Sequence, residues 1–149
     1  MSGTGEDDDV ARLQGAFASL VRALGLLRPD TTPCGQPVSV TEAHAIAELH
    51  DNGPLTQQTL AAALGLQKST VSRLVDQLAA GDLATRTPNP ADRRSVLVAL
   101  TPNGTLRARR LATARRAMFA VLLDQLGDEA RRTAIDGLTH LEEAARART

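Results

Sequence analysis

Two short segments with apolar periodicity, residues 57–64 and 68–80, are separated by three residues, and this spacing restricts the fold more than any other feature. The first segment contains the small residue Ala61, four places before Gly65, and Val71 follows ten places after Ala61. Where two short helices cross, a small residue lets them approach and a glycine tolerates the positive φ of the turn, while a branched residue holds the crossing. The spacing predicts a helix-turn-helix; the alternative is a generic helical hairpin with a solvated outer face.

The second of these segments has two faces of opposite character. The residues predicted to point inward are Val71, Leu74, Val75 and Leu78. At about 100° per residue, the opposite face is polar and carries Arg73, which suits a helix lying in the major groove of DNA. Asp76 can pair with Arg73 or accept a hydrogen bond from cytosine. The residues expected to contact DNA from here are Gln67, Lys68, Ser69, Thr70, Ser72, Arg73, Asp76 and Gln77.

A β-hairpin is predicted directly after this helix. Residues 83–87 and 95–100 are rich in Val, Leu and Thr, and the polar, Pro-rich segment between them cannot continue a strand. Its tip carries Asp92, Arg93 and Arg94. An arginine on such a protruding loop can enter the narrow, electronegative minor groove. A solvated hairpin with an Asp–Arg pair in its turn is the alternative, which the preceding helix-turn-helix disfavours.

Charge is distributed unevenly along a chain in which 17 Lys and Arg balance 17 Asp and Glu. Residues 1–54 carry 8 acidic and 3 basic side chains, whereas residues 55–110 carry 3 acidic and 8 basic ones. Such a basic segment is the local footprint of a DNA-binding module, or else ordinary clustering of surface charge. With two Phe and no Trp or Tyr, the chain lacks the aromatic platforms on which RNA-binding modules stack bases.

The predicted fold class is mostly α with a small β-hairpin wing, a winged helix-turn-helix. Leu13, Phe17, Leu20 and further leucines recur at helical steps, which predicts an amphipathic helix over residues 9–27. Ser39 and Glu42 fit a capping box that opens a helix to about residue 50. Residues 101–102 begin a long helix to about residue 123, and residues 127–129 open a last one.

Residues 54–104 resemble the winged helix-turn-helix of the MarR family of bacterial transcription regulators. The most specific motif is D-x-R, here residues 92–94, followed by a strand and L-T-x-x-G, here residues 100–104. The recognition-helix motif S-T-V-S-R-L-V-D-x-L spans residues 69–78, and the order of the flanking helices fits along nearly the whole chain. The family usually has Asp or Ser as the cap before this helix; here Gln67 implies a cap weaker by about 1 kcal/mol, or a role toward DNA.

The resemblance implies a homodimeric transcriptional regulator, more often a repressor, that binds a pseudo-palindromic operator on double-stranded DNA. It implies that the helix from Ser69 to Ala80 enters the major groove, that Arg94 enters the minor groove and that Asp92 braces the wing. Contacts to the DNA backbone are expected from Thr56, Gln57 and Arg86. The chain is expected to be a single domain over residues 1–149, with the DNA-binding module at 39–101 and dimerisation helices at 9–28 and 102–147.

The apolar stripes of the terminal helices support the dimer independently, because they lie outside the DNA-binding module. The alternative is that these helices pack on each other within one chain. The family further implies a pocket between the dimerisation helices and the module, in which a small ligand, or else an oxidant, would trigger release. Candidates for its lining are Phe17, His44 and Met118.

No cofactor, metal site or catalytic role is expected. His44 and Glu48 share a helix face but are too few for zinc, so a solvated or core pair is the expectation. Cys34 lies in a Pro/Gly loop, whereas oxidant-sensing relatives carry their thiol on the first helix, so redox sensing is not expected. The chain has no phosphate-binding glycine loop, nucleophile elbow or H-E-x-x-H motif. The main functional alternative is a protein-interaction module that retains the winged fold without binding an operator.

The expected location is the cytoplasm, without a membrane partner. The chain has no run of eighteen apolar residues, and its acidic start differs from the basic start of a signal peptide.

Overall fold

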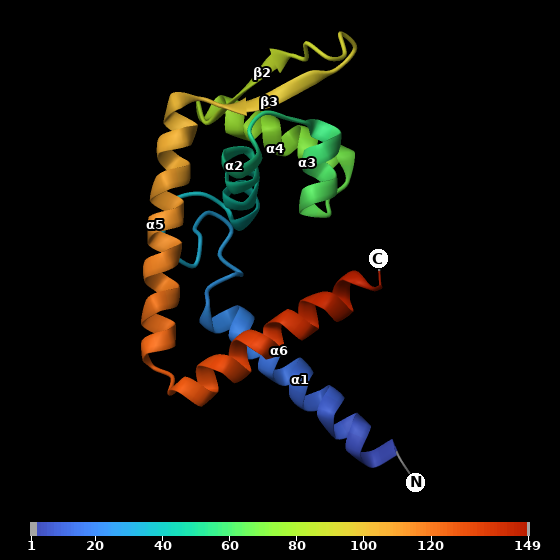
Figure 1. The fold of residues 1–149 in the computed structure, drawn as a ribbon, viewed down its shortest axis with the longest axis vertical. Coiled ribbons are helices and arrows are strands. Elements are labelled where there is room, and N and C mark those ends of the chain that lie inside the picture. Colours follow the sequence, from blue (N-terminus) through green and yellow to red (C-terminus); the bar gives the residue numbers. More distant parts are fainter. Residues whose placement is uncertain (1–2, 149) are drawn as a thin grey trace. The chain divides into compact units, whose positions relative to one another are not determined.

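The computed structural model describes residues 3–148 and confirms a mostly helical fold with a small β-sheet (Figure 1). The helices are α1 (Gly3–Ala23), α2 (Val40–Asn52), α3 (Gln57–Leu64), α4 (Lys68–Ala80), α5 (Pro102–Asp124) and α6 (Asp128–Arg146). Strands β1 (Leu55–Thr56), β2 (Ala84–Pro88) and β3 (Val96–Leu100) form an antiparallel sheet in the order β1-β3-β2. The chain divides between Ala114 and Arg115 into two compact units, each described by itself below.

The core of the first unit lies among α2, α3, α4, the sheet and the first part of α5. Its largest fully buried side chains are Ile46, Leu60, Val71, Val75, Leu78, Val98 and Leu111. All the residues predicted to hold the helix crossing and the inner face of α4 are buried, including Ala61 and Leu74. The apolar period of the sequence therefore determines which face of α4 remains on the surface.

The boundaries of the central helices follow from their capping residues. Ser39 and Glu42 form the predicted capping box, with Ser39 Oγ accepting from Glu42 N at 3.1 Å and Glu42 Oε2 accepting from Ser39 N at 2.8 Å. Gly65 ends α3 at a φ of 64°, as the turn between α3 and α4 requires. The side chain of Gln67, at the N-cap of α4, makes no capping hydrogen bond.

The prediction for the N-terminal helix was wrong at both ends. The helix spans Gly3–Ala23 rather than residues 9–27 or 9–28. Gly25 has a φ of 72°, and a turn closed by hydrogen bonds such as Gly25 N to Arg22 O replaces the helix there. Leu27 is the last residue of this turn, so the regular leucine spacing continues into backbone that is not helical.

The β2–β3 hairpin was predicted to within about one residue at each strand, but β1 was not predicted. Leu55 and Thr56 of β1 pair with Val98 and Leu97 of β3. The hairpin therefore joins a three-stranded sheet through its second strand, which anchors its base beside the start of α3.

The start of α5 is bound to the chain that precedes β2. Thr101 Oγ1 donates to the carbonyl of Asp82 at 2.6 Å and accepts from Gly104 N at 2.9 Å. A Cβ atom on Gly104 would lie 1.9 Å from the carbonyl oxygen of Leu83, so only glycine fits this approach. The L-T-x-x-G motif thus has a structural reason, since its threonine caps α5 and its glycine lets α5 touch the backbone at Leu83.

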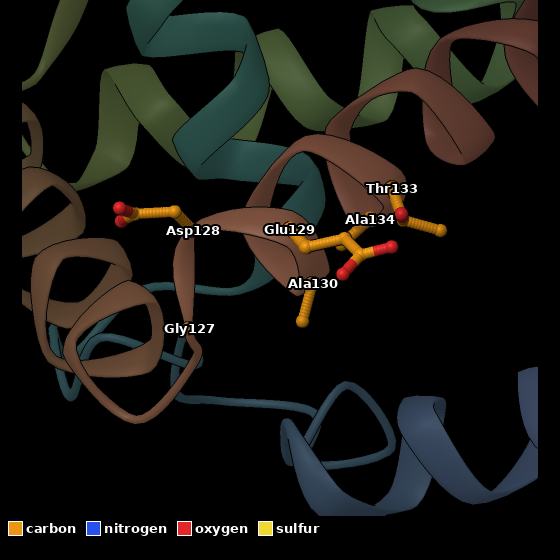
Figure 2. A pocket seen from close by; sticks show the side chains of 6 residues that line it. All are labelled: Gly127, Asp128, Glu129, Ala130, Thr133 and Ala134. Carbon is orange, nitrogen blue, oxygen red and sulfur yellow. The ribbon is translucent and has the colours of Figure 1, made fainter.

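In the second unit, Arg131 stabilises the corner between α5 and α6. Its Nε donates to the carbonyl oxygens of Leu123 and Leu126 at 2.8 and 2.9 Å, and its guanidinium pairs with Asp124 and Asp128. A cation at the end of α5 satisfies carbonyls that have no partner within the helix. A shallow pocket lies along the first turns of α6, and Figure 2 shows its lining residues, which run from Gly127 to Ala134.

None of the helices described has the length and apolar character needed to cross a membrane.

Candidate nucleic-acid interface

The polar face of α4 is the first part of the candidate interface. Every residue predicted to contact DNA from this helix and its cap is exposed except Ser72, which is half-buried. Among residues 5–148, whose side chains the structure describes, none forms a hydrogen bond or ion pair with the side chain of Lys68 or Arg73. Two cations and several short hydroxyl side chains are therefore available on a helix that is anchored by its opposite face.

The wing is the second part of the interface. Asp92, Arg93 and Arg94 lie exposed in the turn between β2 and β3, which extends away from the sheet (Figure 1). Asp92 Oδ1 accepts from the backbone N of Arg94 at 2.9 Å, and Asn89 Nδ2 donates to Ser95 Oγ at 2.7 Å. These hydrogen bonds within the turn stabilise its backbone. The Arg94 side chain therefore projects from a turn of defined conformation.

The bracing by Asn89 and Ser95 was not predicted. Asn89 also accepts from the backbone N of Ala91 through its Oδ1, at 3.0 Å. An Asn that bonds its own backbone two residues on is a typical turn signal, and it was available in the sequence. An open depression lies along this side of the wing, lined by Arg86, Thr87, Pro88, Asn89, Arg93, Ser95 and Val96.

An ion pair joins α4 to the first strand of the hairpin, β2. Arg86 Nη2 on β2 lies 2.6 Å from Asp76 Oδ1 on α4. From the sequence, Arg73 was a predicted partner of Asp76, because the two are three residues apart on one helix. The structure pairs Asp76 with Arg86, which the sequence assigned to the DNA backbone.

Two further residues assigned to the DNA backbone lie at the start of α3. Thr56 is the N-cap of this helix, and its Oγ1 accepts from Thr59 N at 3.1 Å. Gln57 is the first residue of the helix and is half-buried. The hydroxyl of Thr56 thus already stabilises the helix that precedes the turn.

The candidates for a ligand pocket lie in different units. Phe17 on α1 and His44 on α2 are exposed residues of the first unit, and Met118 on α5 is a half-buried residue of the second. Glu48 accepts a hydrogen bond from Asn52, and residues 3–148 contain no cluster of three potential metal ligands. Cys34 Sγ lies 3.1 Å from the hydroxyl of Thr32.

The residues of the candidate interface lie inside a segment that matches a known protein family. A sequence model of the MarR family matches residues 36–95. The repressor NicR of Pseudomonas putida, described as an HTH-type transcriptional repressor, is 32% identical over 71 residues, which are 48% of this chain and 45% of NicR. The regulator ML2140 of Mycobacterium leprae, described as HTH-type and uncharacterized, is 30% identical over 111 residues, or 74% of this chain and 72% of that protein. The matched segment thus spans less than half the length of NicR.

Solved structures share the fold over most of the chain. Streptococcus pneumoniae FabT in complex with DNA has a TM-score of 0.82 at 22% identity, covering 94% of this chain and 99% of that one. S. aureus MepR, also in a DNA complex, has a TM-score of 0.63 at 25% identity, and the match covers 72% of this chain and 80% of that one. Streptomyces coelicolor PcaV in complex with its natural ligand has a TM-score of 0.64 at 24% identity, and the match covers 97% of this chain and 94% of that one.

Proposed function

The chain belongs to the MarR family of transcription regulators, and on that premise we propose that it is a sequence-specific, double-stranded-DNA-binding repressor. It acts as a homodimer on a pseudo-palindromic operator in the cytoplasm and has no catalytic role. The observation that carries the proposal is the exposed Arg73 on α4, which has no hydrogen-bond or ion-pair partner among the side chains of residues 5–148, together with the wing that presents Arg94. The related regulators, among them a repressor by name, support the same function.

In the proposed complex, α4 lies in the major groove and the wing follows the adjacent minor groove. Arg73 binds guanine O6 and N7 or a phosphate, and Ser69 and Thr70 contact nearby base edges or phosphates. Arg94 enters the minor groove, where a narrow A·T-rich segment concentrates negative potential. The DNA-binding module of residues 39–101 makes these contacts, with Thr56 and Gln57 beside the backbone.

The exposed apolar residues of the terminal helices support the homodimer. They include Val10, Leu13, Phe17 and Leu20 on α1, Phe119, Val121 and Leu122 on α5, and Ile135, Leu138 and Leu141 on α6. Phe17 is 62% exposed and Leu138 is 57% exposed in the single chain. Apolar side chains that repeat along a helix face and lie on the surface of their own unit mark a candidate interaction site.

A small-molecule effector is part of the proposal. PcaV, which shares this fold, has been solved in complex with its natural ligand, and we propose that this chain also binds a small-molecule ligand. A ligand with higher affinity for the conformation that does not bind DNA would release the operator.

Footprinting on the DNA upstream of its own gene, followed by affinity measurements at several salt concentrations, tests the proposed function. We expect a symmetric protected site and a logarithmic salt slope of about −0.9 for each phosphate contacted, corresponding to several phosphates. Equal affinity for operator and unrelated DNA, or a slope near zero, would reject operator binding and favour a protein-interaction module.

A further inference from the structure

The pair between Asp76 and Arg86 connects the two parts of the candidate interface. Asp76 lies on the third turn of α4, and Arg86 lies in the middle of β2. Their side-chain atoms approach to 2.6 Å, although the residues are ten positions apart. Among the side chains described, no other ion pair links α4 with the hairpin.

The sheet register directs Arg86 toward α4. Arg86 is opposite Val98 on β3, and Ala84, two residues earlier on β2, is opposite Leu100. Ala84 and Val98 are buried, so the sheet face that they share is the inner one, and the Arg86 side chain emerges on that face. The Arg86 side chain is 35% exposed, so the protein covers most of it.

The position of Asp76 is otherwise unfavourable for a DNA-binding helix. Its side chain is 63% exposed on α4, the helix that also carries the cations Lys68 and Arg73. An unpaired carboxylate there would repel the phosphates that the proposed function brings close. Pairing with Arg86 neutralises the carboxylate and uses the Arg86 guanidinium within the protein.

We propose that Asp76 and Arg86 are positioning residues that hold the wing at a fixed distance from the recognition helix, so that both reach adjacent grooves of one DNA duplex. This inference rests on the proposed function. In it, Arg86 acts through Asp76 rather than as a phosphate contact, and Asp76 increases operator affinity in spite of its negative charge.

Four full-length variants test this role on the footprinted operator and on an unrelated duplex of equal length. They are Asp76→Asn, Arg86→Gln, the double variant and Arg86→Lys. We expect Asp76→Asn and Arg86→Gln each to lower operator affinity by about threefold to tenfold. The loss in the double variant should not exceed the larger of the two single losses. Arg86→Lys should restore part of the loss, because an ammonium can still reach the carboxylate.

Two readouts separate positioning from phosphate contact and from simple destabilisation. The salt slope of Arg86→Gln should equal that of the wild type, whereas loss of a phosphate contact makes it shallower by about one. Minor-groove protection at the wing should weaken while major-groove protection remains. Asp51→Asn, an equal change of charge at the end of α2, should leave operator affinity unchanged.

The proposal is overturned if Asp76→Asn binds the operator as tightly as the wild type or more tightly, or if the losses in the two single variants add. A shallower slope in Arg86→Gln alone would assign Arg86 to a phosphate. If the wild type binds no operator, the proposed function fails, and the positioning role fails with it. The same four variants in urea unfolding then show whether the ion pair itself forms, as a coupling in the free energy of unfolding.

Discussion

Arg73 and Arg94 are the two residues on which operator recognition depends most in the proposed complex. We expect Arg73→Ala and Arg94→Ala each to weaken specific binding by about 1–3 kcal/mol, because each removes a contact to a base edge or a groove. Fluorescence anisotropy with a labelled operator measures the loss. Arg109→Ala, which removes an exposed cation on α5, is the control for net charge. Wild-type affinity in either variant would exclude that arginine from the interface.

Gly104 provides a second prediction at this scale. Gly104→Ala should lower the free energy of unfolding by about 1–3 kcal/mol, because the new Cβ meets the Leu83 carbonyl and forces the backbone apart. Gly137→Ala is the matched control, since it also lies in a helix but has no atom within 4 Å of the new Cβ. It should raise stability by about 0.5–1 kcal/mol. Urea unfolding monitored by circular dichroism compares the two, and equal effects would contradict the steric explanation.

At the scale of residues, the sequence predicts least well which side chains form ion pairs or close contacts with each other. Helical geometry suggests Arg73 for Asp76, since residues three apart on a helix are always neighbours. Arg86 reaches the same carboxylate only because the sheet register turns it toward α4, and that register depends on contacts between distant segments. The motif glycine at position 104 could be identified from the sequence, but its close approach to Leu83 could not.

At the scale of elements, the N-cap of α4 is a weak point that can be improved. Gln67→Ser should raise the free energy of unfolding by about 0.5–1 kcal/mol, because a serine hydroxyl can accept from the backbone N–H groups that Gln67 leaves without a cap. Ser39→Ala, which removes an existing capping box on α2, should lower stability by a similar amount. Thermal unfolding of the two variants is the measurement. A destabilising Gln67→Ser would show that this glutamine has a structural role of its own.

The central elements could be predicted because their signals are local. Gly65, Thr56 and the capping box mark helix ends by their own chemistry, and α3 and α4 begin and end where the sequence predicts. Strand β1 is two residues long and therefore shows no alternation, and Thr56 also caps α3. The N-terminal helix was misplaced because its leucines keep a helical spacing across Gly25, where the positive φ ends the helix.

For the whole molecule, the central prediction is the association of two chains. Leu138→Glu should shift the protein from dimer to monomer in sedimentation velocity, because a carboxylate would be buried in an apolar interface. His140→Glu places the same charge on another face of α6 and should leave the dimer intact. A Leu138→Glu variant that remains dimeric would exclude the exposed stripe of α6 from the interface.

The exposed stripes also connect regulation to gene dosage. If two chains must dimerise before both recognition helices can bind DNA, the monomer–dimer equilibrium determines the concentration of active regulator. At concentrations well below the dimer dissociation constant, halving the number of copies would lower the number of dimers about fourfold. A promoter controlled by this protein would then respond more steeply than in proportion to the protein's expression level. In the proposed dimer, the exposed leucines and phenylalanines of the terminal helices would thus set the concentration at which repression begins.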